Sequence, residues 1–554
     1  MDEYSDVSAR SQSGGPRRSG PLAICRDSAR GRRFIAINVE HIQLGRRFVP
    51  DCGVVSDPGA ALDALAEWPG RANTRAALGR VRIELNIRAE RMTTTTTPAE
   101  PIWSIDMRYE LVIHTDRALL PEGFRAAEIG VRNERISVIA DPGAGLVGER
   151  TIRLTEDQVL LPGLVDTHVH VNEPGRTEWE GFATATQAAA AGGVTTIIDM
   201  PLNSLPPTVD VDSLQVKRDA AAPAAHIDVG FWGGAIPGNT SELIPMHEQG
   251  VFGFKCFLEH SGVDEFPHLE PSEMELDMGV LAEASSMMIV HAEDSRTLAG
   301  APKATGRMYA DFLRSRPAEA ENVAIEAVID AARRTGARAH ILHLSSAQAL
   351  DTIAAAKQEG IALTVETCPH YLVLASEEIP DGATTHKCCP PIRGSANRDA
   401  LWQGLQDGVI DCVVSDHSPS TAELKLLDTG DFGAAWGGIS SLQLGLTLLW
   451  TEARERGIAL EEVVRWMSSA PAAVAGVQDK GMLSVGADAD FAVFSPEARW
   501  TVDAENLWHR NKISAYESRE LVGAVDTTIL RGTEVDYRTP RGRLLQRTPA
   551  VTTH

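Results

Sequence analysis

The sequence lacks any hydrophobic stretch of the length that a membrane span requires. A spanning helix needs about 18 consecutive apolar residues, whereas the longest candidate stretch, from Leu442 to Trp450, is interrupted by Gln443 and Gly445. The N-terminus also lacks the apolar core of a secretory signal peptide. The sequence therefore predicts neither a membrane protein nor a secreted one.

Cysteine is scarce, and basic residues are in deficit. The 554 residues include seven cysteines without CxxC spacing, a pattern that favours neither a disulfide framework nor a structural zinc site. This cysteine usage is typical of the reducing cytoplasm. The chain has 52 basic and 76 acidic residues and a formal net charge of −24. Because such a surface repels phosphate backbones, nucleic acid is not an expected partner.

The first 91 residues differ in composition from the rest of the chain. They contain 15 arginines, no lysine and 11 acidic residues, and they show no sustained hydrophobic periodicity. Three interpretations remain open: a disordered tail, a small extra domain, or translated sequence upstream of a true start at Met92. We expect residues 1–107 to be a disordered or non-native extension that carries no chemistry.

The centre of the chain alternates apolar strand-like runs with alanine-rich helical patterns, which is typical of parallel βα units. Eight such runs fit the strands of a (β/α)8 barrel. They are 161–167, 194–199, 226–231, 253–257, 287–291, 340–344, 362–366 and 412–416.

Short β-rich runs flank this centre on both sides and favour a small β-domain built from both flanks. We expect that domain to comprise residues 108–160 and 482–540. The barrel would then occupy 161–481, and 541–554 would form a C-terminal tail.

Ionisable residues recur at the predicted ends of the barrel strands. His168 and His170 close the first strand, and their spacing of two places both side chains on one face. The others are Lys255 in the fourth strand, His291 at the end of the fifth, His343 near the end of the sixth, and Asp416 at the end of the eighth. A barrel brings the carboxyl ends of its strands together at one mouth. Nitrogen and oxygen ligands without thiolates predict Zn²⁺ or another first-row divalent ion there.

Several motifs resemble the cyclic-amidase branch of the amidohydrolase superfamily, which contains dihydroorotases, dihydropyrimidinases (hydantoinases) and allantoinases. They are 160–170 (LLPGLVDTHVH), 290–294 (VHAED), 343–346 (HLSS), 366–372 (ETCPHYL), 415–419 (SDHSP) and 481–490 (GMLSVGADAD). The resemblance extends from about residue 109 to about residue 532. It implies a TIM-like barrel, a flanking β-sandwich and a binuclear metal centre.

The same resemblance implies a role for each predicted ligand. His168, His170 and Asp416 would hold one metal ion, and His291 and His343 the other. Lys255 would be carboxylated by CO₂ to a carbamate that bridges the two ions. A water between the ions would attack the substrate, and Asp416 would be the catalytic base that passes the proton to the leaving nitrogen.

Residues in several loops distinguish among the members of this branch. Dihydroorotases have an arginine two positions after the HxH pair, where it binds a carboxylate, and this chain has Asn172. The loop 172–182 (NEPGRTEWEGF) and the segment 436–441 (WGGISS) resemble allantoinases. Dihydropyrimidinases have a tyrosine five residues after the carboxylated lysine, where this chain has His260. The predicted substrate contacts are Asn172, His260, Ser261, Ser418 and Gly438.

The resemblance thus implies hydrolysis of the ring amide of allantoin to allantoate, a step of purine degradation. Hydantoinase or dihydropyrimidinase activity is the alternative, and a dihydroorotase or a non-catalytic scaffold homologue is less favoured. The implied protein is a cytoplasmic homotetramer that binds two divalent metal ions per subunit, with zinc the first choice. Its partner would be a small ureide substrate, not nucleic acid or membrane.

Overall fold

The computed structural model describes residues 22–26, 33–37 and 108–547. The chain forms two compact units, Met1–Met107 and Arg108–His554. In the first unit, β1 (Leu22–Arg26) pairs with β2 (Arg33–Ile37) in antiparallel register. The rest of the predicted extension 1–107 lies outside the described residues, as do the last seven residues of the predicted tail. Among the described helices, none is both long and apolar enough to cross a membrane.

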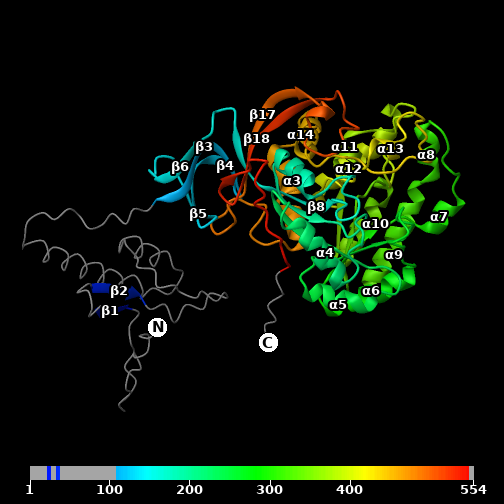
Figure 1. Ribbon diagram of the computed structural model, residues 1–554, viewed down its shortest axis with the longest axis horizontal. Coiled ribbons are helices and arrows are strands. Elements are labelled where there is room, and N and C mark those ends of the chain that lie inside the picture. Colours follow the sequence, from blue (N-terminus) through cyan, green and yellow to red (C-terminus); the bar gives the residue numbers. More distant parts are fainter. Residues whose placement is uncertain (1–21, 27–32, 38–107, 548–554) are drawn as a thin grey trace, which may run out of the picture. The chain divides into compact units, whose positions relative to one another are not determined.

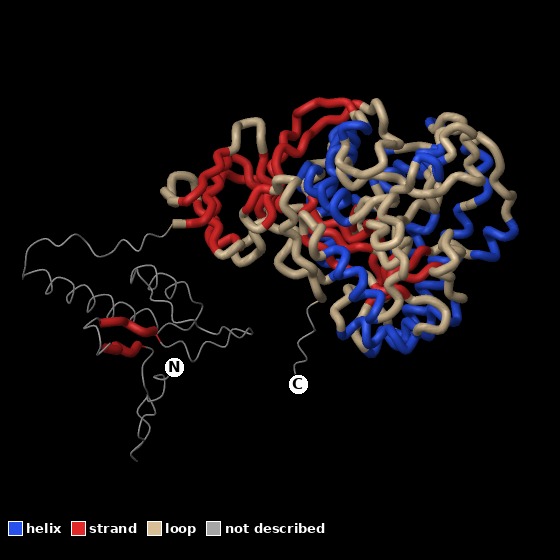
Figure 2. Tube along the Cα trace, viewed as in Figure 1, coloured by secondary structure: helices blue, strands red, loops and turns tan. Residues whose placement is uncertain are grey.

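Eight parallel strand positions of the second unit form the barrel, and one of them is split into β10 and β11. Figure 2 shows these strands inside a layer of helices. The strands are β8 (Leu164–Val169), β9 (Val194–Asp199), β10 (Asp228–Phe231), β11 (Gly233–Gly234), β12 (Phe254–Phe257), β13 (Met287–His291), β14 (Arg338–Ile341), β15 (Leu363–Thr367) and β16 (Cys412–Val413).

The helices of this unit follow the strands along the chain. They are α3 (Phe182–Ala191), α4 (Val211–Ala221), α5 (Thr240–Glu248), α6 (Pro271–Glu283), α7 (Ser295–Gly300), α8 (Tyr309–Ser315), α9 (Ala318–Thr335), α10 (Leu350–Glu359), α11 (Pro369–Val373), α12 (Ser395–Gln406), α13 (Ala422–Lys425), α14 (Gly445–Glu455), α15 (Leu460–Met467) and α16 (Ser469–Ala475). Short 3₁₀ turns are η1 (Ala347–Ala349), η2 (Ser376–Glu378), η3 (Thr384–His386) and η4 (Ala504–Asn506).

Hydrogen bonds connect the barrel strands in two runs, β10-β9-β8 and β11-β12-β13-β14-β15-β16. The segment after β16 meets β8 through a parallel bridge between Val169 and His417, and the His170 amide donates to the His417 carbonyl at 2.8 Å. Part of the predicted C-terminal tail lies beside β10. Val229 there donates to the Arg543 carbonyl at 2.9 Å and accepts from the Leu545 amide at 2.8 Å.

Two predicted strands end earlier than the sequence pattern indicated. β14 stops at Ile341 instead of Leu344, and β16 stops at Val413 instead of Asp416. The reason is the backbone of the residues beyond them, because His343 has φ 36° and Asp416 has φ 42°. Left-handed backbone cannot continue a β-strand. Both side chains are therefore carried on turns.

Strands from both ends of the second unit form one eight-stranded sheet of order β19-β18-β17-β7-β3-β4-β5, with β6 paired to β3 (Figure 1). They are β3 (Tyr109–Leu120), β4 (Gly123–Arg132), β5 (Arg135–Ala140), β6 (Gly148–Arg153), β7 (Val159–Pro162), β17 (Phe491–Thr501), β18 (Glu520–Leu530) and β19 (Thr533–Glu534). The predicted division into a β-sandwich of 108–160 and 482–540 and a barrel of 161–481 stays a prediction, since residues 108–554 form one compact unit.

A buried ion cluster joins this sheet to the barrel. The Lys480 ammonium lies 2.6 Å from Asp228 at the start of β10 and 2.7 Å from Asp490 just before β17. Arg531, which follows β18, pairs with the same Asp228. Each of these charges is buried and matched by an opposite charge, which is the condition under which buried charges are tolerated.

Gly163 is the single residue between the sheet strand β7 and the barrel strand β8. The sequence predicted one continuous strand over 161–167, and the structure divides it here. A Cβ atom at this position would lie 2.2 Å from Thr195 Oγ1 of β9, so only glycine allows the approach. The chain can therefore pass from sheet to barrel without a connecting loop.

We expect Gly163→Ala to lower the free energy of unfolding by about 1–3 kcal/mol, because the added methyl group overpacks a closed contact. Gly279→Ala in α6 is the matched control, since a Cβ there meets nothing within 4 Å. Because alanine favours a helix over glycine, the control should gain about 0.5–1 kcal/mol. Denaturant unfolding of both variants measures the difference. Equal effects of the two substitutions would contradict this role of Gly163.

Candidate metal centre

The six residues predicted as metal ligands come from five different barrel strands or the turns after them. Five of these residues line one cavity of about 250 Å³: His170, Lys255, His291, His343 and Asp416. His168 lies behind the cavity wall, with its ring centroid 5.5 Å from that of His170 and 5.4 Å from that of His343. All six side chains are buried.

His168, His170 and Asp416 form the first potential metal site. Their ligand atoms lie within 4.8 Å of one another. Asp416 Oδ1 is 3.1 Å from His168 Nε2 and 3.7 Å from His170 Nε2. Burial, together with the charges of Lys255 and His168, lowers the pKa of His170 well below its usual range. A neutral imidazole keeps a lone pair for a cation, so this donor set fits a first-row divalent ion.

Glu366, in β15, fixes the orientation of His168. Its Oε1 lies 2.5 Å from His168 Nδ1, and its Oε2 lies 3.0 Å from His340 Nε2. Burial alone would raise the pKa of Glu366, but the charges and hydrogen bonds of the two histidines outweigh it and lower that pKa to about 2. A carboxylate on Nδ1 directs the other ring nitrogen toward a metal. His168 Nε2 accordingly has no hydrogen-bond partner among the described residues.

His291 and His343 form the second potential site. His291 Nδ1 lies 2.9 Å from His343 Nε2, and Glu293 Oε2 lies 2.8 Å from His291 Nε2. Burial is the largest cause of the lowered pKa of both histidines, and it outweighs the attraction of Glu293 for a proton on His291. Two neutral rings whose nitrogens face each other repel unless a proton or a cation lies between them. The pair therefore fits a cation held by nitrogen ligands.

Lys255 is 1% exposed, and its Nζ lies 4.7 Å from the centre of the Phe257 ring. Burial lowers the pKa of this lysine to about 8, although Asp416 and Glu366 attract a proton to it. The neutral amine of Lys255 is then far more populated near neutral pH than that of an ordinary lysine, and a neutral amine is nucleophilic. Burial also raises the pKa of Asp416, against the effect of His168 and Lys255.

Four of the five predicted substrate contacts line the cavity: His260, Ser261, Ser418 and Gly438. Asn172 does not line it. That side chain is fully buried, and its Nδ2 donates to the Pro419 carbonyl at 3.5 Å. The Ser261 hydroxyl donates to the Phe266 carbonyl at 2.6 Å, so its proton is already engaged. At Gly438, φ is +113° and a Cβ would lie 2.1 Å from the Ser418 carbonyl oxygen, so glycine is required there.

Sequence reasoning missed several residues of the cavity wall, among them Arg316, Lys387, Cys389 and Trp436. Two buried lysines fix the backbone of residues 433–438 on this wall. Lys387 Nζ donates to the Ala435 carbonyl at 2.5 Å, and Lys425 Nζ donates to the Trp436 carbonyl at 3.1 Å. Burial lowers the pKa of Lys425 to about 7. No sequence signal marks these lysines, because their partners are backbone carbonyls from a different loop.

Comparisons with known proteins identify the family of the chain. The protein-family model described as "Amidohydrolase family" matches residues 159–535 of the chain. The chain is 55% identical over 444 residues to an allantoinase of Streptomyces avermitilis, which covers 79% of this chain and 99% of that protein. It is 46% identical over 389 residues to an allantoinase of Saccharomyces cerevisiae, covering 69% of this chain and 84% of that protein.

Solved structures give the same fold. An L-hydantoinase (dihydropyrimidinase) from Arthrobacter aurescens superposes with a TM-score of 0.74 at 28% identity, covering 79% of this chain and 100% of that one. A D-hydantoinase from Thermus sp. gives a TM-score of 0.72 at 27% identity, covering 79% and 99%. The predicted (β/α)8 fold is thereby confirmed, and the chain belongs to the amidohydrolase family.

Proposed function

We propose that this protein is an allantoinase, a hydrolase that opens the hydantoin ring of allantoin at its cyclic amide to give allantoate. The observation that carries the proposal is the 55% identity to the Streptomyces allantoinase over 99% of its length. The buried cluster of four histidines, one lysine and one aspartate supports it with the chemistry that such a hydrolysis needs. A hydantoinase is the second candidate, favoured by the TM-score of 0.74 to the Arthrobacter hydantoinase at 28% identity.

Two divalent ions, zinc being our first choice, would be held by these residues. His168, His170 and Asp416 would hold one, and His291 and His343 the other. When bound, the ions supply Lewis acidity that lowers the pKa of water and polarises a carbonyl.

Lys255 would become the ligand shared by both ions. Its neutral Nζ forms a bond to the carbon of CO₂ and releases one proton, which leaves a carbamate with two oxygen donors. An ammonium has no lone pair for a metal ion, whereas the carbamate oxygens do. The low-polarity surroundings that lower the pKa of Lys255 to about 8 favour this reaction.

Asp416 would be the general base and then the general acid. Its carboxylate faces the cavity beside His168 and His170 and has a raised pKa. A carboxylate of raised basicity accepts the proton of the attacking water and returns it to the leaving ring nitrogen.

The proposed substrate contacts on the cavity wall are His260, Ser261, Ser418 and Gly438, and Asn172 would act from behind that wall. A cytoplasmic homotetramer acting in purine degradation is also part of the proposal.

Purified protein, loaded with zinc in the presence of bicarbonate, should hydrolyse allantoin in preference to hydantoin, dihydrouracil and dihydroorotate. We expect a preference of at least about 100-fold in kcat/KM, the level reached when a site's polar groups match the substrate. Metal analysis of the same sample should give two ions per chain. Turnover of hydantoin without turnover of allantoin would favour the hydantoinase instead, and no metal with no turnover would favour a scaffold.

Lys255→Ala should lose more than about 100-fold in kcat, because a bridging ligand matters at least as much as the outer-shell partners of a metal site. Added acetate or propionate should restore part of the activity, since a free carboxylate can take the position of the carbamate. Lys255→Arg is the matched control, because it keeps the charge but cannot be carboxylated, and carboxylates should not rescue it. Full activity of Lys255→Ala without added acid would refute the carbamate role.

Reactivation of metal-free, decarboxylated protein should depend on pH through Lys255. Since the amine is the reactive form, the reactivation rate should rise with pH and level off above about 8. The measurement is recovery of activity after adding metal at a fixed concentration of dissolved CO₂. A rate that still rises tenfold per pH unit between pH 9 and 10 would show an ordinary lysine and contradict the assignment.

A further inference from the structure

Arg316, the residue after α8, lies where two cavities adjoin. It lines the cavity of about 250 Å³ that contains the predicted metal ligands, and also a neighbouring cavity of about 440 Å³. Among the described residues, only Lys387 and Cys389 also line both cavities. A side chain at this junction can contact the part of a substrate that extends away from the predicted metal ligands.

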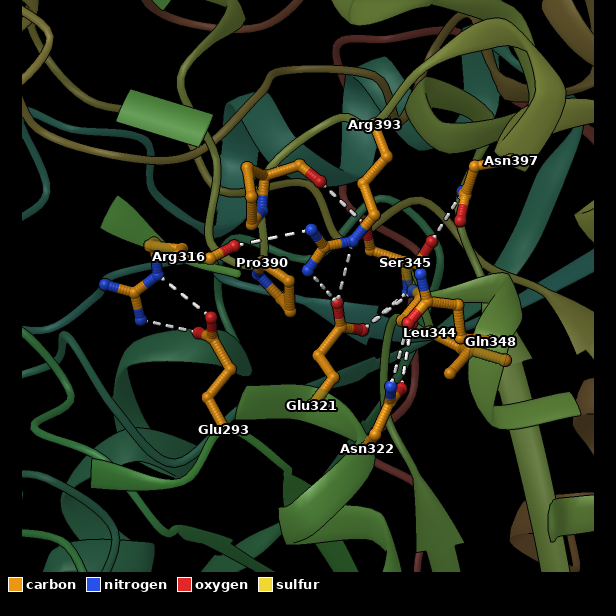
Figure 3. A network of polar contacts seen from close by, with 12 residues as sticks. Glu293, Arg316, Glu321, Asn322, Leu344, Ser345, Gln348, Pro390, Arg393 and Asn397 are labelled. Carbon is orange, nitrogen blue, oxygen red and sulfur yellow. Dashed lines mark hydrogen bonds and ion pairs between the residues drawn. The ribbon is translucent and has the colours of Figure 1, made fainter. Parts of the chain in front are cut away.

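One carboxylate holds the Arg316 guanidinium from one side. Its Nε donates to Glu293 Oε1 at 3.0 Å, and its Nη2 donates to Glu293 Oε2 at 2.5 Å (Figure 3). The Nη1 group makes no hydrogen bond among residues 108–547. Because a bidentate pair fixes the plane of the guanidinium, the free Nη1 donor has a defined direction.

The backbone of Arg316 is fixed as well. Its carbonyl accepts from Arg393 Nη1 at 3.3 Å, and Arg393 Nη2 donates to Glu321 Oε2 at 2.5 Å. Glu321 Oε1 in turn accepts from the Ser345 and Ser346 amides, both at 3.0 Å (Figure 3). These contacts anchor Arg316 to the turn that follows His343. A donor held in this way loses little conformational entropy when a ligand binds.

The charge around Arg316 selects the kind of acceptor. Glu293 is fully buried, and its negative charge already balances the guanidinium. The neighbouring Lys387 ammonium donates to the Gly433 and Ala435 carbonyls at 3.2 and 2.5 Å. The nearby Glu293 carboxylate would repel an anion. A neutral carbonyl oxygen, by contrast, needs only one N–H donor and no uncompensated positive charge on the protein. Nη1 therefore suits the carbonyl of a neutral urea or amide group.

We propose that Arg316 is a specificity-determining residue whose Nη1 donates a hydrogen bond to the carbonyl oxygen of the ureido substituent of the substrate. The inference rests on the proposed function, since allantoin is a hydantoin ring that carries a ureido group on its C5 atom. Hydantoin has the same ring without that group. Comparing the two compounds therefore separates the effect of Arg316 on binding of the ureido group from any effect on binding of the ring.

The test compares wild type, Arg316→Lys and Arg316→Gln, all loaded with zinc and bicarbonate. We expect KM for allantoin to rise at least about tenfold in both variants, because a hydrogen bond from a charged donor is lost or misplaced. The inhibition constant of hydantoin against allantoin hydrolysis should stay within about twofold. Arg314→Lys is the matched control, because Arg314 lies two residues earlier and its side chain is 67% exposed. It should change neither constant.

Glu293→Gln separates positioning from recognition. Glu293 contacts both His291 and Arg316. Its loss should therefore lower metal content and kcat, and it should weaken the binding of both allantoin and hydantoin. If the Arg316 variants behave like Glu293→Gln, with equal losses for allantoin and hydantoin, Arg316 acts only through Glu293 and the inference is wrong. Metal content and thermal unfolding are measured for every variant. If Arg316→Gln does not fold, the comparison of wild type with Arg316→Lys tests the inference. Wild-type protein that fails to hydrolyse allantoin would instead refute the proposed function.

Discussion

Two buried carboxylates behind the histidines, Glu366 and Glu293, are the constraint on which the centre depends. Each accepts a hydrogen bond from one ring nitrogen of a histidine and leaves the other nitrogen directed into the site. Without these partners, a buried imidazole could rotate or change tautomer, and its lone pair would not be available at a fixed position. Each carboxylate is itself satisfied, Glu366 by His340 and Glu293 by Arg316. The hydrogen-bond network therefore extends from the core of the barrel to the cavity wall.

Burial is the second common factor, and it affects acids and bases in opposite ways. It lowers the pKa of His170 and His343, which keeps their ring nitrogens neutral, it lowers the pKa of Lys255 to about 8, and it raises the pKa of Asp416. Neutral nitrogens are what metal binding and carboxylation require, and a basic carboxylate is what proton transfer requires. One physical cause thus prepares groups of different type for their proposed roles.

The rest of the cavity wall is built on a different principle. Its shape comes from backbone segments fixed by buried cations, with Lys387 and Lys425 holding residues 433–438 and Arg393 holding the carbonyl of Arg316. Backbone held by internal hydrogen bonds changes little when a ligand enters. The ligand side and the wall meet at Arg316, which belongs to both networks. Its guanidinium is held by Glu293, and its carbonyl is held by Arg393.

The clustering of the predicted ligands could be inferred from the sequence because a parallel barrel brings the ends of its strands together, and His168, His170, Lys255 and His291 lie at or near such ends. The extents of two strands were wrong because His343 and Asp416 have left-handed backbone, which hydrophobic patterns do not reveal. Asn172 could be placed near the site by its distance from His170 along the chain. Its direction, away from the cavity, depends on a contact with Pro419 far along the chain.

By itself the sequence determined the alternation of strands and helices, and through its motifs the family and the types of residue at the strand ends. These are properties of local spacing, which the chain carries without reference to its fold. Only the tertiary structure decided which carboxylate supports which histidine, which lysines hold the wall, and that Arg316 keeps a free donor at the junction of two cavities. Such pairings join residues up to 198 positions apart, as His168 and Glu366 are. Apart from His291 and Glu293, which are two positions apart, these pairings arise from burial and packing, which no local pattern encodes.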